Sequence, residues 1–298
     1  MENEEIQSNN KSVDLVLLKK EVDALQIAIH SKQLPWYKNI PTILSILALL
    51  FSFGTTAVSY LRTRSQDIQS SRIELRGLLQ RLAALPRENI EITKKYEKTD
   101  PAAIASVTGL LNQENSLLAR QAAEITKNLP EEFVSATEHF AIGSALLNSY
   151  NISGAIDSLT KAIDVSTDMN DRVGALRVRA NALFISGQPE TGRVDYQRAL
   201  NVFQEFKINY NDYTKRSIHI WTELSWAYSE VGVGLNDNAL QHVANAQNIV
   251  SGLIPSPGAE QLKSQINHTK SIIATANNLP KSTMGLPLGV IAPVGVGQ

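Results

Sequence analysis

The sequence predicts an all-α protein with one membrane-spanning helix, followed by a domain of helical hairpins. Three observations lead to this expectation: an uninterrupted apolar stretch, heptad-like seams on both sides of it, and small residues that recur at fixed spacing. The 298 residues carry a net charge of -1 and no cysteine. Disulfide scaffolds, thiolate metal sites and cysteine nucleophiles are therefore excluded, and the balanced charge gives no indication of nucleic-acid binding.

The apolar stretch runs from Ile40 to Leu61 and lies between the charged residues Lys38 and Arg62. As a helix it would be about 33 Å long, which is close to the hydrocarbon thickness of a bilayer. Its strongly apolar residues contribute on the order of -5 kcal/mol to insertion. We expect residues 40–61 to be a single-pass anchor in the cell or inner membrane. The alternatives are a buried core helix, which is rarely so long without a charge, and a cleaved signal peptide, whose apolar region is shorter.

Positive charge on the two sides of the apolar stretch bears on its orientation. Within about twenty residues of it, three lysines precede it and five arginines follow it, namely Lys20, Lys32, Lys38, Arg62, Arg64, Arg72, Arg76 and Arg81. The positive-inside rule therefore favours a cytoplasmic location for the C-terminal part. The opposite orientation would leave the charged 39-residue N-terminal tail inside.

Two seams flank the apolar stretch. Within the tail of residues 1–39, apolar residues at steps of three and four from Leu15 to Ile29 predict a short amphipathic helix. Its mixed charge favours a coiled-coil pairing helix over an interfacial one. The alternative is a helix that packs on the chain's own soluble domain. Residues 62–86 are expected to be a helical stalk that Pro86 ends, and residues 87–100 a charged linker. The seams suggest a homodimer through residues 15–29 and 61–85.

From residue 101 to residue 279 the pattern is helical throughout. Small residues recur three times with spacings of twelve and seven, at Gly143, Ala155, Ala162, Ala180, Gly192, Ala199, Ala227, Ala239 and Ala246. Small residues at such places let two antiparallel helices approach closely. We therefore expect hairpins at 136–169, 173–206 and 220–253. Two short helices in 101–128 and one helix in 258–277 are expected to cap this array.

This spacing resembles the tetratricopeptide repeat (TPR) family, whose 34-residue helix-turn-helix unit has small residues at its eighth, twentieth and twenty-seventh positions. The chain departs from the family at the fourth position, which is usually aromatic and here is His139, Leu176 or Glu223. The closing proline of the unit is also missing. The resemblance implies a solenoid with a concave groove along its first helices. A generic stack of helical hairpins is the alternative.

By the same resemblance, the groove would bind a protein or peptide partner. The groove residues expected here are Phe140, Ser144, Asn148, Arg177, Asn181, Phe184, Trp221 and Tyr228. Arg177 and Asn181 are one helical turn apart and are similar to the basic-plus-asparagine pair with which family members hold a peptide carboxylate. The aromatic residues would supply an apolar anchor. For Trp221 the alternative is that it packs in the core between hairpins.

The sequence contains no phosphate loop, dinucleotide fingerprint or nucleophile elbow, and its five histidines lack the spacing of metal ligands. We therefore expect no catalytic, cofactor or metal site. The expected function is a membrane-anchored adaptor or scaffold. The alternative is a sensory or regulatory membrane protein that signals through its span and stalk.

Residues 280–298 are rich in glycine and proline, which disfavour a helix. We expect this tail to be disordered. Its apolar residues leave open that it docks on the groove.

Overall fold

A computed structural model describes residues 19–27, 40–96, 101–206 and 210–277. Every regular element in these ranges is a helix, so the all-α expectation is confirmed. The chain divides into two compact units, residues 1–67 and 68–298. The predicted tail at 280–298 lies outside the described residues, as do the two ends of the predicted N-terminal seam.

The first unit contains a helix at residues 19–27 and the beginning of the long helix α2 (Ile40–Tyr96). Val22 and Leu25, which belong to the N-terminal seam, are both exposed. Most of the large apolar side chains of α2 from Ile43 to Leu61 are also exposed, including Leu50 at 60% and Phe51 at 75%. By length and composition, α2 contains one stretch apolar enough to cross a membrane, and none of that stretch is buried by the rest of the chain.

Helix α2 does not end at Pro86, as the sequence predicted, but continues to Tyr96. A proline inside a helix removes one backbone hydrogen bond and costs about 3 kcal/mol. The helix continues nevertheless, and it makes contacts on both sides of Pro86. Arg81 pairs with Glu88 beyond the proline and with Glu114 of α3 (Pro101–Asn128), and Thr108 of α3 hydrogen-bonds to Asn89. The predicted linker at 87–100 is therefore helical through residue 96.

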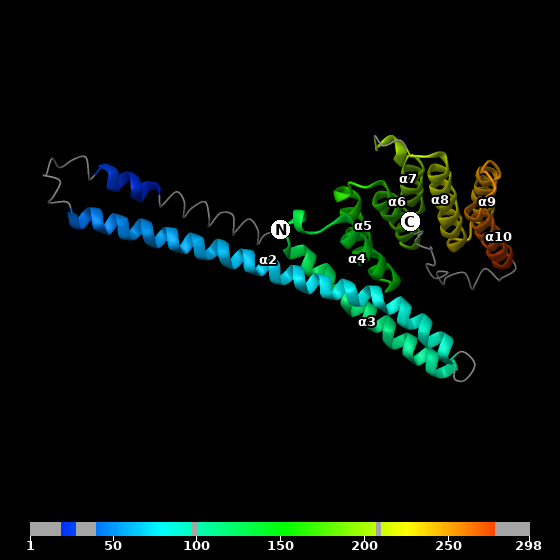
Figure 1. Ribbon diagram of the computed structural model, residues 1–298, viewed down its shortest axis with the longest axis horizontal. Coiled ribbons are helices and arrows are strands. Elements are labelled where there is room, and N and C mark those ends of the chain that lie inside the picture. The colour runs from blue at the N-terminus through cyan, green and yellow to red at the C-terminus, as the bar shows by residue number, and fades with distance from the viewer. Residues whose placement is uncertain (1–18, 28–39, 97–100, 207–209, 278–298) are drawn as a thin grey trace. The chain divides into compact units, whose positions relative to one another are not determined.

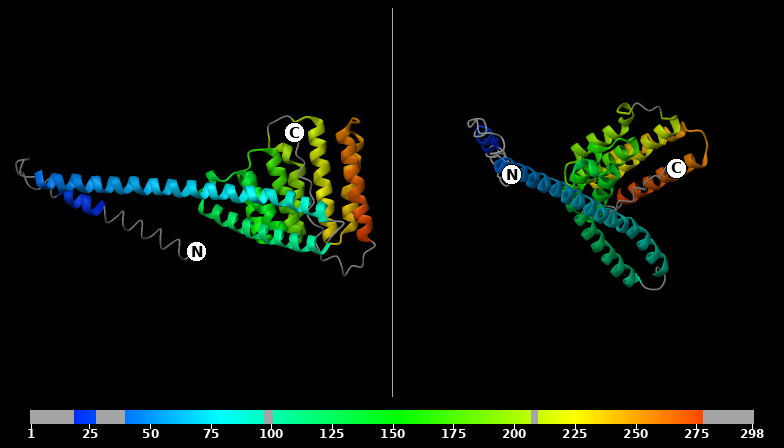
Figure 2. Two further views of the ribbon diagram at one scale, coloured as in Figure 1. Left: turned by 60° about the horizontal axis from the view of Figure 1, so that its bottom comes forward. Right: turned by 60° about the vertical axis from the view of Figure 1, so that its left-hand side comes forward.

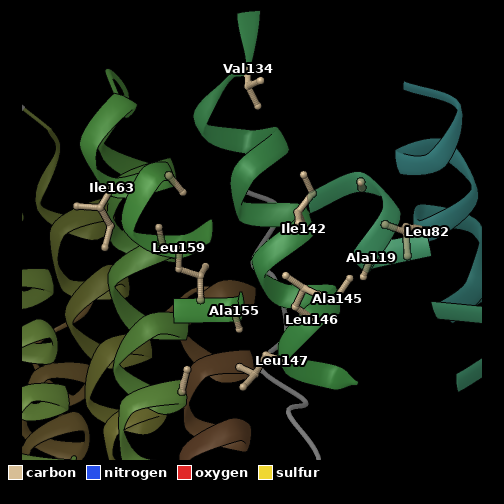
Figure 3. Packing of buried hydrophobic residues seen from close by; sticks show 14 of the residues in the cluster. Leu82, Ala119, Val134, Ile142, Ala145, Leu146, Leu147, Ala155, Leu159 and Ile163 are labelled. Carbon is tan, nitrogen blue, oxygen red and sulfur yellow. The ribbon is translucent and has the colours of Figure 1, made fainter. Parts of the chain in front are cut away.

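The expected stalk seam is buried within the chain itself. Leu75, Leu82 and Leu85 pack in one core with Ala119 of α3 and Ile142 of α4 (Ala136–Asn148). Figure 3 shows Leu82 beside Ala119 in this core. The C-terminal half of the 61–85 seam is thus not an exposed surface for a second copy. Tertiary packing rather than pairing explains its heptad spacing.

The second unit is an array of antiparallel hairpins that follow one another along the chain (Figures 1 and 2). Three hairpins occur where the sequence predicted them: α4 with α5 (Ile152–Val165), α6 (Met169–Ile185) with α7 (Pro189–Leu200), and α8 (Asp212–Gly232) with α9 (Asn236–Ser251). Two 3-10 turns, Glu131–Phe133 and Val202–Gln204, precede α4 and follow α7. Region 101–128 is one helix, α3, and not two.

The last helix, α10 (Pro257–Asn277), has the two faces that a capping helix needs. Leu262, Ile266 and Ile273 are buried in a core shared with α8 and α9. Lys263 and Lys270 lie among the exposed residues of the other face. This arrangement agrees with the capping helix expected in 258–277, whose outer face is polar.

All nine recurring small residues are buried. A Cβ at Gly192 would lie 2.6 Å from Phe184 Cδ2 and 2.8 Å from the carbonyl oxygen of Ala180. A Cβ at Gly143 would lie 2.6 Å from Leu159 Cγ. The two helices of a hairpin therefore touch at the backbone, as the spacing predicted.

Gly192→Val should destabilise the domain, because the added side chain would meet backbone as well as the Phe184 ring. We expect a loss of about 1–3 kcal/mol, the usual cost of overpacking, measured by chemical denaturation. Gly109→Ala is the matched control, because a Cβ there meets nothing within 4 Å. This control should gain about 0.5–1 kcal/mol from helix propensity. Equal stability of the two variants would contradict the close approach.

Candidate functional site

The residues predicted to line a groove lie on the first helices of the three hairpins, α4, α6 and α8. These helices contact one another directly. A Cβ at Gly174 of α6 would lie 3.5 Å from Phe140 Cε2 of α4. Ser229 of α8 donates a hydrogen bond to Asn181 Oδ1 of α6 over 3.2 Å. Several of the predicted positions therefore join neighbouring hairpins.

Arg177 is the most distinctive of the predicted residues. Its guanidinium is partly buried, and its Nε donates to the Val173 carbonyl oxygen over 3.4 Å. Within the part of the chain that the structure describes, no carboxylate lies within 4 Å of it. Burial lowers the pKa of Arg177 to about 10, and Tyr196 opposes this shift. A cation held in such a place favours an anion as its partner.

Other donors in this region also have unused capacity. Residues 34 apart in sequence face each other on α4 and α6, as Thr137 does with Asp171 and Phe140 with Gly174. By this offset Ser144 of α4 faces residue 178 of α6, which is next to Arg177. Among the described residues, the buried Ser144 Oγ has no hydrogen-bond partner. Within the described ranges, Asn181 uses only its amide oxygen in a hydrogen bond, so its Nδ2 is a further donor.

The remaining predicted residues do not form one surface. Phe184 is only 2% exposed and packs in a small core with Tyr196, so its prediction as a groove anchor is wrong. Trp221 packs against the core of α8, α9 and α10, which is the alternative considered for it. The Tyr228 hydroxyl accepts a hydrogen bond from Thr269 of α10, and Asn148 is exposed at the end of α4.

Sequence reasoning missed a polar-aromatic cluster between the second and third hairpins. We define it by six residues: Arg193, Tyr196, Glu223, Trp226, Glu230 and His242. The Trp226 ring stacks on Tyr196 at 5.4 Å and on His242 at 4.1 Å. Arg193 binds Glu230 through Nε and Nη2, both at 2.8 Å, and His242 Nδ1 lies 2.7 Å from Glu223 Oε2.

Glu230 and Tyr196 find their hydrogen-bond partners within this cluster. Burial alone would raise the pKa of Glu230, but hydrogen bonds from Arg193 and from Trp226 Nε1 hold it below its usual value. Burial raises the pKa of Tyr196, so its hydroxyl is protonated and shares a 2.7 Å hydrogen bond with Ser229. The cluster is therefore a structural network that joins the hairpins.

A sequence signal for this cluster existed. Glu223 and Glu230 are seven residues apart on α8, and Trp226 lies between them on the same face. Two carboxylates on a buried face require cationic or donor partners. Those partners, Arg193 and His242, are far away in the sequence, so the pattern alone does not name them.

A shallow cleft of about 360 Å³ lies where α4 and α6 begin. Its lining includes Glu131, Glu132 and Val134 before α4, Ser135 at the N-cap of α4, and Asp171 in the first turn of α6. Three carboxylates give it acidic character. In the described ranges, no group of three or more His, Asp or Glu side chains is placed to hold a metal ion.

The comparisons with known proteins add no family. No protein-family model, no curated protein and no solved structure matches the chain. The likeness to tetratricopeptide repeats therefore rests on the spacing of the small residues and on the hairpins that they form.

Proposed function

We propose that this chain is a membrane-anchored adaptor whose TPR-like helical domain holds a protein or peptide partner near the bilayer. The observation that carries the proposal is the exposed apolar part of α2, joined in one helix to residues that pack in the helical domain. Exposed apolar side chains over this length are unfavourable in water, and a bilayer would cover them. A buried core helix, the alternative, would have these residues covered by the chain.

The partner surface we propose is centred on Arg177 and Asn181 of α6, with Ser144 beside them. These side chains offer hydrogen-bond donors that the described chain does not use. A carboxylate of the partner would accept from the Arg177 guanidinium and the Asn181 amide together. We place the helical domain in the cytoplasm, because the arginines beyond Leu61 outnumber the lysines before Ile40.

A second candidate function is that of a sensory or regulatory membrane protein. One observation favours it: α2 carries both the apolar stretch and the buried leucines Leu75, Leu82 and Leu85. A change in the membrane part of such a helix would reach the helical domain without passing through a flexible linker. Crosslinking along residues 61–96 with and without a stimulus separates the two functions, since an adaptor predicts an unchanged pattern.

The adaptor proposal is tested by recovering partners from solubilised membranes. We expect Arg177→Glu to reduce recovery of the partner at least about tenfold relative to the wild type, the equivalent of one charge-assisted hydrogen bond. Lys161→Glu is the control, because it makes the same charge reversal at an exposed site on the second helix of a hairpin. Thermal unfolding verifies that both variants fold. Recovery of the same partners by all three proteins would refute the proposed surface.

A further inference from the structure

Arg72 and Glu138 join α2 to the beginning of α4. Arg72 Nη1 donates to both carboxylate oxygens of Glu138, over 2.8 and 2.9 Å. The side chains are 20% and 16% exposed, so the pair is largely shielded from solvent. Within the described chain, Arg72 makes no other ion pair. It lies four residues after Ile68, which is the first residue of α2 that packs on the core of the helical domain.

Glu138 has a second task at the same time. It is the third residue of α4 and completes a capping box with Ser135. Its Oε2 accepts from the Ser135 backbone N–H over 2.8 Å, and the Ser135 hydroxyl accepts from the Glu138 backbone N–H over 3.2 Å. One carboxylate thus holds α2 and the first turn of α4 together. Arg72 holds the Glu138 carboxylate in the position that it occupies in the complete capping box.

The electrostatics of Glu138 depend on both partners. Burial would raise the pKa of this carboxyl, but the hydrogen bonds from Arg72 and Ser135 hold it below its usual value. Without Arg72, a shielded carboxylate would keep its desolvation cost and lose its cation. The side chain would then turn toward water, and Ser135 would lose its acceptor.

The cleft described above lies at this point. Its lining contains Ser135 and Ala136, together with Glu131 and Glu132 of the turn before α4. The cleft is therefore lined by one residue of the capping box, Ser135, and the other residue of the box, Glu138, binds Arg72.

We propose that the Arg72–Glu138 pair is a latch through which the position of α2 sets the structure of the cleft at residues 131–138. Closed, the latch completes the cap of α4 and holds the lining of the cleft in place. Displacement of α2 withdraws Arg72, frays the first turn of α4 and opens this edge of the domain. The proposal does not depend on what the domain binds, nor on whether α2 crosses a membrane.

Hydrogen–deuterium exchange on the full-length chain in detergent tests the latch. Arg72→Gln should speed exchange at the amides of residues 131–139 roughly tenfold, the loss of one charge-assisted hydrogen bond. Amides of α9 should be unaffected. Arg87→Gln is the control, because it removes an exposed ion pair with Glu91 on the same helix. Arg72→Lys, which keeps the charge, should restore part of the protection.

Reciprocity separates a latch from a simple cap, because coupling between two sites acts in both directions. Ser135→Ala removes the hydroxyl half of the capping box, keeps the Ser135 backbone N–H that donates to Glu138, and leaves Arg72 in place. In a latch, this change also speeds exchange in α2 around residues 68–76. The proposal is overturned if Arg72→Gln leaves residues 131–139 unchanged or speeds exchange equally throughout α4–α10. It is also overturned if Ser135→Ala affects α4 alone.

Discussion

A variant that carries Leu47→Arg and Leu50→Arg should no longer be found in the membrane fraction. Both leucines are exposed in the middle of the apolar stretch of α2. Each arginine near the centre of a membrane helix costs about 3 kcal/mol, so two exceed the roughly -5 kcal/mol that the apolar residues contribute. Flotation of membranes on a density gradient, followed by immunoblotting, measures the result.

A matched control exists in α3. Leu110 and Leu117 are 64% and 58% exposed, close to the 56% of Leu47 and 60% of Leu50, but they lie in the helical domain. The double variant Leu110→Arg with Leu117→Arg should remain in the membrane fraction. If both double variants float equally well, the apolar stretch of α2 is not the anchor.

Arg193→Met should cost about 3–5 kcal/mol of folding free energy, because it leaves the carboxylate of Glu230 buried without its cation. Glu230 is only 1% exposed, and Arg193 holds it through two hydrogen bonds of 2.8 Å. The pKa of Glu230 is held below its usual 4.5. The contribution of the pair is therefore complete at neutral pH and declines as the pH falls below that value. Urea unfolding followed by tryptophan fluorescence measures the loss.

Two further variants give this prediction its controls. Arg87→Met removes an exposed ion pair with Glu91 and should cost less than about 1 kcal/mol. Arg193→Met combined with Glu230→Leu should recover most of the stability, because no buried charge is left unpaired. A single Arg193→Met variant as stable as Arg87→Met would show that the polar-aromatic cluster does not hold the second and third hairpins together.

The register of the hairpins could be predicted because it is imposed by a local steric requirement. Where two helices touch at the backbone, only glycine or alanine fits, as at Gly192 and Ala180. Such positions are visible in the sequence without knowledge of any partner. The three hairpins therefore include the predicted repeat positions. Their helices α6 and α8 begin earlier than the predicted units, at Met169 and Asp212.

Other features depend on contacts between distant residues and could not be predicted in this way. Local propensity ends a helix at Pro86, but α2 continues, with Leu82 and Leu85 buried before the proline and Asn89 bound to Thr108 of α3 after it. The heptad spacing of Leu75 and Leu82 marks a buried face and does not say whether a second copy or the chain itself covers it. Resemblance correctly placed Phe184 on the first helix of a hairpin but exposed it to the groove, whereas its ring is buried beside Gly192.

The most direct test of the central claim uses the absence of cysteine from the sequence. Single cysteines are placed at Leu44, Leu50 and Val58 of α2, and at Ser264 on the exposed face of α10. Each is treated with a membrane-impermeant maleimide in native membranes opened on both sides. We predict labelling at position 264 and protection at the three positions in α2, because a bilayer covers them. Labelling at position 50 as fast as at position 264 would contradict a membrane-spanning α2.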